Sequence, residues 1–356
     1  MSALFSSLTI KDIEFKNRIV VSPMCQYSSI DGFANDWHLV HLGSRAVGGA
    51  ALILLEATAV SPEGRITPDD LGIWKDEHIA ELGRINRFIE EHGAIAGVQL
   101  AHAGRKSSHT SPWNGAVQIA EDNDGWKTVA PSALAFVENE SAPDELDEEG
   151  IQKVIGDFKS AASRVLQAGF KVLEIHAAHG YLLHEFYSPL SNHRKDRYGG
   201  SFENRIRLLL EIIQAVQEVW PGNLPMFVRI SASDWVENGW KIEDSIALAR
   251  ILKQRGVDLI DCSSGGNLPK APIPVGPLYQ SEFAARIKQD AGILTGAVGL
   301  ITSAHEAEGL IAEGKSDMVL LARQMLRDPY FPLRAATELG ARIPWPVQYE
   351  RAKPRI

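Results

Sequence analysis

The chain has 356 residues, with 36 Lys and Arg against 45 Asp and Glu, and a formal net charge of −9 at pH 7. Hydrophobic residues make up 45% and charged residues 23%, a composition that excludes a disordered or low-complexity chain. The acidic balance argues against a nucleic-acid partner, since phosphate backbones bind basic surfaces. No apolar run approaches the roughly 20 residues of a membrane span. The amino terminus lacks the pattern of an export signal, so we expect a cytoplasmic protein without a membrane partner.

Cysteine usage narrows the function classes further. The two cysteines, Cys25 and Cys262, form no C-x-x-C pair and no ligand cluster. This excludes a disulfide scaffold, a zinc ribbon and an iron–sulfur domain, and we predict no metal site. Counting alone leaves a single bridge between the two open, although a cytoplasmic protein would keep them reduced.

Eight short apolar runs alternate with helical patterns along the chain. Most runs are continuously apolar, as expected of parallel strands that are covered on both faces. Helices with apolar residues three and four positions apart are predicted over 147–168, 203–219 and 243–255. The predicted strands cover residues 18–24, 50–58, 95–103, 170–177, 225–231, 257–263, 292–297 and 316–322.

This alternation predicts an α/β protein, a (β/α)8 TIM barrel in a single domain over residues 1–356. An open dinucleotide-binding sheet is less favoured, because the first turns lack a G-x-G-x-x-G. Long loops follow the third and fourth strands, at 104–146 and 178–202. Both leave the carboxyl ends of strands, where barrel enzymes assemble their active sites.

Polar side chains at these strand ends are the candidates for chemistry. His176 and His179 could be metal ligands lacking an obvious third partner, packed core histidines, or donors that hold a carbonyl or nitro oxygen. Tyr181 could then donate a proton. Cys25 is either a small buried hydrophobe or a functional thiol. Arg229 lies in the apolar run Phe-Val-Arg-Ile, where a charge needs an anion or a partner.

A phosphate site is predicted after strands seven and eight. Gly296 and Gly299 let backbone amides approach a ligand, and Arg323 adds a fixed cation from the neighbouring loop. Thr302 and Ser303 are positioned to cap a helix over 304–313, whose amino terminus would face the same place. Ordinary turn glycines and a surface arginine are the alternative.

Several longer runs resemble the Old Yellow Enzyme family of FMN-dependent ene-reductases, in particular its thermophilic-like branch. They are Pro23-Met24-Cys25 with Tyr27, Gln99-Leu-Ala-His-Ala-Gly-Arg-Lys106, His176-Ala-Ala-His-Gly-Tyr181, Ser188-Pro-Leu-Ser-Asn-His-Arg194 and Tyr198-Gly-Gly-Ser-Phe-Glu-Asn-Arg205. The similarity extends from Asn17 to Arg351, nearly the whole chain. It implies a TIM barrel that binds FMN tightly without a covalent bond.

The resemblance implies a role for each matching residue. Cys25 would lie near flavin N5, Ala57 would pack on the ring, and Gln99 and Arg229 would bind the pyrimidine edge. Ala322 and Arg323 would hold the phosphate, with Ala322 where the family commonly has glycine. The predicted cofactor-binding residues are Ser22, Pro23, Met24, Cys25, Ala57, Gln99, Arg229, Gly296, Gly299, Ala322 and Arg323.

The implied reaction is ping-pong: NADPH or NADH reduces FMN and leaves, and an activated alkene is reduced in the same pocket. His176 and His179 would grip the carbonyl or nitro oxygen, and Tyr181 or water would protonate the α-carbon. Tyr27 would add a contact to the activating group, and Lys106 would help to meet the phosphate of the nicotinamide cofactor. Substrate choice and the choice between NADPH and NADH stay open.

The resemblance also implies that Arg351 completes the pocket of a neighbouring subunit. We therefore expect a homodimer or tetramer with segment 340–356 at the interface. The alternative is a frayed basic tail. A main activity toward nitro groups or nitrate esters is an alternative function. A non-flavin barrel aldolase or isomerase is another, with Glu56 and Glu174 as interior carboxylates but no lysine inside a strand.

Overall fold

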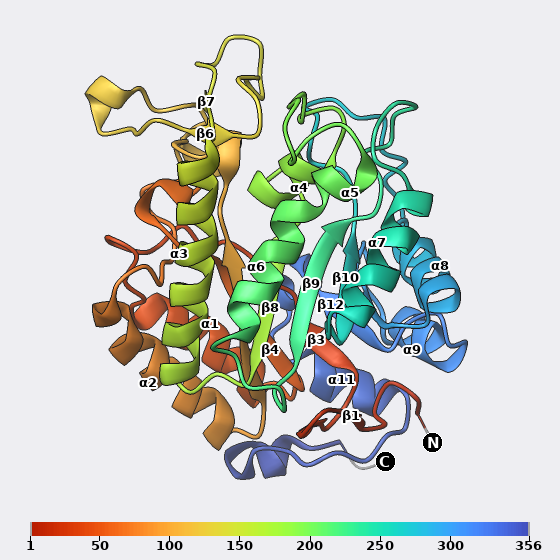
Figure 1. The fold of residues 1–356 in the computed structure, drawn as a ribbon. Helices are drawn as coiled ribbons and strands as arrows, with labels where there is room; N and C mark the ends of the chain where they lie inside the picture. The colour runs from red at the N-terminus through yellow and green to blue at the C-terminus, as the bar shows by residue number, and fades with distance from the viewer. Residues whose placement is uncertain (1, 355–356) are drawn as a thin grey trace.

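The computed structural model describes residues 2–354, and within them eight parallel strands form a closed barrel (Figure 1). Each of the eight predicted runs overlaps one barrel strand, so the predicted fold is confirmed. In order around the barrel, the strands are β3 (Ile19–Val21), β4 (Leu52–Ala59), β5 (Ile95–Ala101), β8 (Val172–Ala177), β9 (Met226–Ser231), β10 (Leu259–Ser263), β11 (Leu294–Ala297) and β12 (Met318–Leu321).

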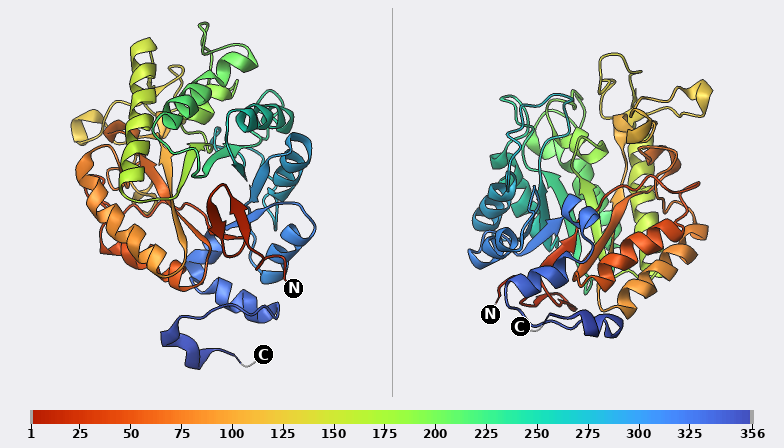
Figure 2. Two further views of the ribbon diagram at one scale, coloured as in Figure 1. Left: turned by 60° about the horizontal axis from the view of Figure 1, so that its bottom comes forward. Right: turned by 180° about the vertical axis from the view of Figure 1, so that it is seen from behind.

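Amphipathic helices cover the outside of the barrel (Figure 2). In α6, the apolar side chains of Leu209, Ile213 and Val216 are buried, as the spacing predicts. The predicted helix over 203–219 is present as two helices, α5 and α6, that meet at Ile206. The helices are α1 (Asp36–Val47), α2 (Ile79–Glu91), α3 (Glu148–Gln167), α4 (Leu182–Tyr187), α5 (Phe202–Arg205), α6 (Arg207–Gln217), α7 (Ile242–Gln254), α8 (Ser281–Ala291), α9 (Ala304–Ala312), α10 (Arg323–Arg327) and α11 (Phe331–Glu338).

The interior of the barrel has an apolar end and a polar end. Phe15, Leu52, Phe227 and Leu259 belong to one buried cluster at the amino ends of the strands. A hairpin of β1 (Leu8–Ile10) and β2 (Ile13–Phe15) covers this end, in dark red in Figure 2. Because apolar packing excludes water there, a polar site can be built only toward the other end.

Both long loops leave the barrel at this other end. Segment 104–146 carries the short strands β6 (Val129–Ala130) and β7 (Asp144–Glu145), which rise above the barrel in Figure 1. Segment 178–202 carries α4 and lies at the same end. Among the described helices, none is long and apolar enough to cross a membrane.

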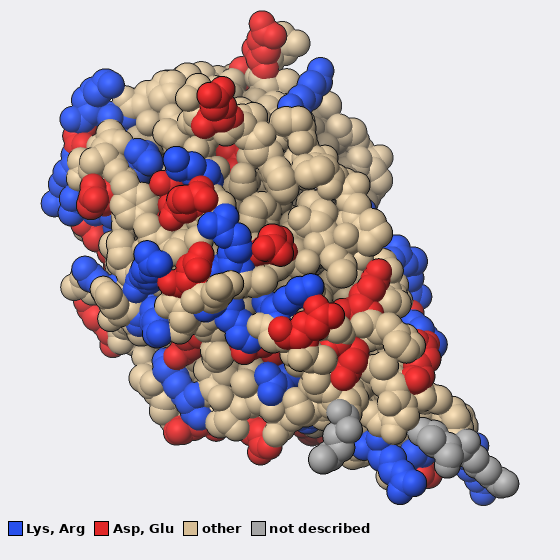
Figure 3. Space-filling model, turned by 90° about the vertical axis from the view of Figure 1, so that its right-hand side faces the viewer, with Lys and Arg blue, Asp and Glu red and all other residues tan. Residues whose placement is uncertain are grey.

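The segment after α11 runs along the opposite end of the barrel, where both termini lie (Figures 1 and 2). It ends in a short 3-10 helix, Val347–Ala352. Acidic and basic side chains are interspersed on the face drawn in Figure 3. Exposed ion pairs such as Arg334–Asp328 reflect this mixing.

Candidate functional site

The strand register brings the predicted site residues to two adjacent levels of the barrel. Ala57 pairs with Gln99 across β4 and β5, and Gln99 pairs with Glu174 on β8. His176 pairs with Arg229 across β8 and β9. Directly paired residues on parallel strands project to the same side. Residues that are far apart in the sequence therefore line one polar surface.

Three aromatic side chains, His176, His179 and Tyr181, converge at the end of β8, and we call them the histidine wall. The ring centres of His176 and His179 are 5.0 Å apart, and those of His176 and Tyr181 are also 5.0 Å apart. The N–H of Ala178 donates to His176 Nδ1 at 3.2 Å, so His176 carries its hydrogen on Nε2. His179 Nε2 lies 2.7 Å from Ser263 Oγ, so Nδ1 is the ring nitrogen of His179 that remains for a ligand.

Burial keeps the histidine wall uncharged. Burial, reinforced by the positive charge of Arg229, holds the pKa values of His176 and His179 well below the ordinary value. Burial raises the pKa of Tyr181 well above its ordinary value, so the phenol keeps its proton. The histidine wall therefore offers neutral donors rather than cations.

A cavity of about 180 Å³ opens beside the histidine wall and is lined by Tyr27, Lys106 and Tyr181. The loop after β5 supplies much of the rest, including Phe136, and Trp113 packs edge-on against Tyr27 at 5.7 Å. The predicted substrate-binding residues of this chain, other than Arg351, thus lie around or next to one cavity. The long loop decides its shape.

Lys106 lines this cavity, but its ammonium is bound within the protein. Its Nζ donates to the carbonyl oxygens of His179 at 2.8 Å and Gly266 at 3.0 Å. It also lies 4.5 Å from the centre of the Phe136 ring. Burial lowers its pKa to about 8. These contacts join two loops, and the predicted contact with a nicotinamide phosphate stays a prediction.

The loop that carries Cys25 is held by a carboxylate. A register shift between Leu55 and Ala57 in β4 places Glu56 at an irregularity, and such bulges re-aim side chains near active sites. Glu56 Oε2 accepts a hydrogen bond from the N–H of Gln26 at 2.8 Å, which fixes the loop. Pro23, Met24 and Cys25 stay half-buried, accessible to a ligand.

The two cysteines are both free, so the disulfide that counting left open is not formed. Cys25 lies in the half-buried loop after β3, and Cys262 is buried in β10. Burial, together with the negative charges of Asp70 and Glu56, raises the pKa of the Cys25 thiol. It is therefore a neutral thiol in this structure.

Arg229 has the partner that its sequence context requires. Its Nε lies 3.1 Å from Asp261 Oδ2, and its Nη1 donates to Ser22 Oγ at 3.3 Å. Asp261 is fully buried. Asp261 is not among the site residues predicted from the sequence, although an aspartate inside the apolar run Leu-Ile-Asp-Cys-Ser was a usable signal. The cation of Arg229 is thus fixed by a carboxylate on the neighbouring strand.

Gln99 rests on a second buried carboxyl group. Its Nε2 donates to Glu174 Oε1 at 2.8 Å, while Glu174 Oε2 has no hydrogen-bond partner in the described part of the chain. Burial, with the nearby negative charge of Asp261, raises the pKa of Glu174 to about 8. Burial also raises the pKa of Asp261 to about 6, against the opposing effect of Arg229. Gln99 and Arg229, the two side chains predicted to bind the pyrimidine edge, are therefore each held by a buried carboxyl group on a neighbouring strand.

A second cavity, of about 160 Å³, lies at the ends of β11 and β12, and we call it the arginine cavity after Arg229, Arg323 and Arg327. None of the described residues that line it is a carboxylate. Gly299 lines it with φ +124°, a backbone conformation that L side chains rarely adopt. Ala322 lines it with a negative φ of −95°, so this position does not need the left-handed conformation that favours glycine.

Two parts of the predicted phosphate site differ in the structure. Gly296 does not line the arginine cavity, because its missing side chain faces Leu320, whose Cδ1 would lie 2.3 Å from a Cβ. Ser303 caps α9 as predicted, but Glu306 Oε2 accepts from the N–H groups of Thr302 at 2.8 Å and Ser303 at 3.0 Å. These amides already have an anion, so arginines supply the positive charge of the cavity.

These features fit FMN. The arginine cavity suits a phosphate dianion because it holds cations with no lining carboxylate. Arg229 is shared between this cavity and the polar surface at the barrel mouth, where Gln99 offers an amide. The half-buried loop of Cys25 lies on the neighbouring strand end. The phosphate of FMN would meet the arginine cavity, its pyrimidine edge would meet Gln99 and Arg229, and its ring system would meet the loop of Cys25.

Arg351 lies far from this site. It belongs to the 3-10 helix at the opposite end of the barrel from the histidine wall, so it cannot complete the pocket of its own chain (Figure 2). Next to it, a groove of about 620 Å³ runs between α11 and the tail and is lined by Tyr330, Leu333 and Trp345.

Comparison with known proteins agrees with this geometry. The model of the NADH:flavin oxidoreductase / NADH oxidase family matches residues 3–341. NADPH dehydrogenase of Bacillus subtilis is 50% identical over 350 residues, covering 98% of each chain. Morphinone reductase in complex with tetrahydroNAD is 28% identical with a TM-score of 0.77, over 96% of this chain and 92% of that one. A 2-naphthoyl-CoA reductase is 25% identical with a TM-score of 0.85, over 95% of this chain and 52% of that one.

Proposed function

Because the chain belongs to the NADH:flavin oxidoreductase / NADH oxidase family and is an oxidoreductase, we propose that it reduces activated C=C bonds of α,β-unsaturated carbonyl or nitro compounds. The predicted resemblance to the Old Yellow Enzyme family is confirmed at the level of the family. The observation that carries the proposal is the histidine wall: two neutral imidazoles packed against a neutral phenol that lines one cavity.

FMN is the cofactor of the family, and NADPH, named for the relatives, is the reductant we propose. Arg323 and the backbone at Gly299 and Ala322 would hold the phosphate in the arginine cavity. Gln99 and Arg229 would meet the pyrimidine edge, with Asp261 fixing the guanidinium. Ser22, Pro23, Met24, Cys25 and Ala57 would contact the ring system.

Bound FMN would supply the hydride chemistry that links the nicotinamide to the β-carbon of the substrate. The protein's part is to make that carbon electrophilic. His176 would donate from Nε2 to the substrate oxygen. His179 would donate from Nδ1, which requires the Ser263 hydroxyl to donate to its Nε2. Neutral donors in a dry site stabilise negative charge as it develops on that oxygen.

Tyr181 completes the reaction as a proton donor. Its raised pKa keeps the phenol protonated, and it lies next to His176, so its hydroxyl group would give a proton to the α-carbon. Tyr27 would contact the activating group from the facing side of the same cavity. Lys106 would act mainly by holding the wall in place.

We also propose that the site is completed in a homo-oligomer in the cytoplasm. Arg351 is exposed and lies at the end of the molecule opposite its own histidine wall. The exposed side chain of Val347, 83% accessible, and the apolar groove beside α11 offer contact area for a second copy. In a dimer or tetramer, Arg351 would enter the neighbouring pocket.

The test is spectroscopic. We expect the purified protein to carry the visible absorption band of an oxidised flavin, to lose it on anaerobic addition of NADPH, and to recover it with 2-cyclohexenone. Recovery with the enone supports the proposal. Bleaching by NADPH with recovery only by a nitroalkane or a nitrate ester would replace ene-reduction with reduction of the nitro group. A protein that binds no added FMN would overturn the proposal.

A further inference from the structure

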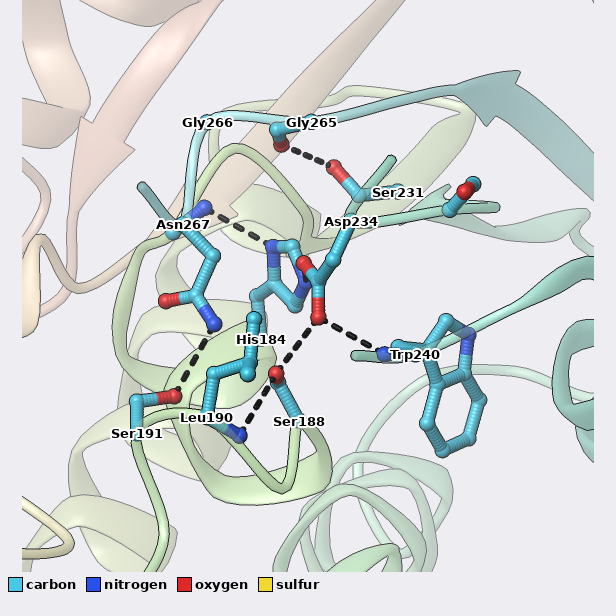
Figure 4. A network of polar contacts seen from close by, with 12 residues as sticks. His184, Ser188, Leu190, Ser191, Ser231, Asp234, Trp240, Gly265, Gly266 and Asn267 are labelled. Carbon is cyan, nitrogen blue, oxygen red and sulfur yellow. Dashed lines mark hydrogen bonds and ion pairs between the residues drawn. The ribbon is translucent and has the colours of Figure 1, made fainter. Parts of the chain in front are cut away.

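A buried network behind the histidine wall has no part in the chemistry proposed above. At its centre, His184 of α4 lies beside Asp234, and both side chains are fully out of solvent (Figure 4). His184 Nε2 is 3.0 Å from Asp234 Oδ1, and within residues 2–354 neither atom has another polar partner. The other carboxylate oxygen accepts from Ser188 Oγ at 2.6 Å and from the N–H of Trp240 at 2.8 Å.

The imidazole of His184 connects this carboxylate to the loop of the histidine wall. Its Nδ1 lies 2.9 Å from the backbone nitrogen of Gly180, and a backbone N–H can only donate. Nδ1 therefore carries no hydrogen, and the single hydrogen of the neutral ring lies on Nε2, toward Asp234. Burial alone would raise the pKa of Asp234, but His184, Ser188 and the N–H of Trp240 together hold it below its ordinary value. A carboxylate thus selects the tautomer that can accept from Gly180.

Gly180 lies between two members of the histidine wall, in a turn that needs support. His179 has φ +61° and Gly180 has φ +72°, both in the left-handed region, and His179 bears a side chain that disfavours it. A Cβ on Gly180 would lie 2.2 Å from the carbonyl oxygen of Gly266, so the turn is also pressed against the loop after β10. The His184 contact fixes the peptide at the centre of this turn.

We propose that His184 and Asp234 are positioning residues that hold the turn at Gly180 and thereby aim the His179 imidazole and the Tyr181 phenol at the substrate. The claim rests on the proposed function for its consequence in catalysis. The support of the turn is independent of the proposed function, because all the contacts involved lie within the protein. Ser231 Oγ, which accepts from the N–H of His179 at 2.9 Å, is a second support of the same turn.

The decisive variant is Asp234→Asn, which keeps the size of the side chain. An amide whose oxygen continues to accept from Ser188 and Trp240 turns its NH₂ group toward His184 Nε2. The imidazole must then carry its hydrogen on Nδ1, facing the N–H of Gly180, and the contact is lost. His184→Leu removes the same acceptor directly. His184→Asn keeps an acceptor oxygen near the position of Nδ1 and should preserve the turn.

The experiment uses the FMN-bound protein and two readouts. Hydrogen–deuterium exchange of the segment 178–182 should accelerate at least tenfold in Asp234→Asn and His184→Leu and stay near the parent rate in His184→Asn. The KM for 2-cyclohexenone should rise about tenfold in the first two variants, with a smaller change in kcat. Ser245→Ala is the matched control: it removes the buried acceptor of Trp240 Nε1, at 2.7 Å, without touching the turn. It should lower the melting temperature and change neither readout.

Unchanged exchange at 178–182 in Asp234→Asn and His184→Leu, with melting temperatures lowered as in Ser245→Ala, would overturn the proposal and leave the network a part of the core. If one of these two variants fails to fold, His184→Asn is compared with the other. The same acceleration of exchange in both would also overturn the proposal. If the parent protein reduces no enone, the proposed function fails. The exchange result still decides whether His184 and Asp234 position the turn.

Discussion

The histidine wall and the arginine cavity lie at the same end of the barrel, and both present hydrogen-bond donors to oxygen atoms. They differ in charge. His176 and His179 are held neutral by burial, whereas Arg229 and Arg323 are permanent cations. The positive charge of Arg229 is balanced by the carboxylate of Asp261.

The difference matches the oxygens that each region would meet. A phosphate is charged before it binds, so fixed cations stabilise it at every stage. A carbonyl or nitro oxygen gains charge only during the reaction, so neutral donors in a buried site favour the transition state over the ground state. Under the proposed function, the arginine cavity would hold the cofactor and the histidine wall would activate the substrate, so variants of the two regions should affect different measurements.

The largest effect is expected from His176→Ala in the histidine wall. Loss of one donor to the developing oxyanion should lower kcat/KM for 2-cyclohexenone about 10²- to 10³-fold. The Kd of FMN, measured by fluorescence titration, should stay near the parent value. His305→Ala, an exposed histidine of α9, is the control. A variant that loses FMN affinity as strongly as activity would break the separation of the two regions.

Tyr181→Phe should affect one half of the reaction. Without the phenol, reoxidation by the enone should slow about 10²-fold, because protonation of the α-carbon would depend on water. Stopped-flow absorbance should find the rate of reduction by NADPH nearly unchanged. Tyr198→Phe, which removes a phenol hydroxyl that donates to Glu211 Oε2 at 2.8 Å and lines neither cavity, serves as control. Equal slowing of both half-reactions would argue that Tyr181 shapes the cavity rather than donating a proton.

Arg323→Ala tests the arginine cavity in the converse way. Removing a charged donor to the phosphate should raise the Kd of FMN about 10- to 100-fold. At saturating FMN, kcat should be within a small factor of the parent value. The exposed Arg286→Ala on α8 controls for the loss of a surface charge. An unchanged Kd would remove Arg323 from the cofactor site.

The smallest effect is expected from the buried carboxyl groups that contact Gln99 and Arg229. The raised pKa of Glu174, about 8 against an ordinary value of 4.5, means that the folded protein keeps a proton that the unfolded chain has lost. This contribution to stability is complete below pH 4.5 and disappears as the pH rises through about 8. Glutamine has no such dependence. The FMN-free Glu174→Gln variant should therefore melt about 2–4 °C higher than the parent at pH 8, with a smaller difference near pH 5.

Calorimetry across this pH range makes the measurement, with Glu138→Gln on the exposed loop as control. The hydrogen bond from Gln99 Nε2 persists in the variant, because glutamine keeps an acceptor oxygen. A constant difference between variant and parent at every pH would mean that Glu174 is ionised throughout. Glu174 and Asp261 would then both be ionised near the single cation of Arg229.

The eight barrel strands were predictable because each is a short apolar run, and burial on both faces leaves that mark in any sequence. Strand ends were predictable for the same reason, and with them His176, Arg229 and Arg323. Segment 203–219 marks the limit of periodicity: the pattern is helical throughout, but the break at Ile206 depends on packing around the loop before it. Gly296 shows a second limit of prediction from sequence. A glycine can make room either for a ligand or for a neighbouring side chain, and here it makes room for Leu320.

The sequence by itself determined the barrel, the end that carries the site and the chemical types of the groups there, because apolar periodicity and strand order are local properties. Tertiary structure alone decided which polar groups meet. Asp261 pairs with Arg229 through the register of β9 and β10, and Asp234 reaches His184 from another strand end. Such pairings depend on distances between segments far apart in the chain, and these distances exist only after the barrel closes.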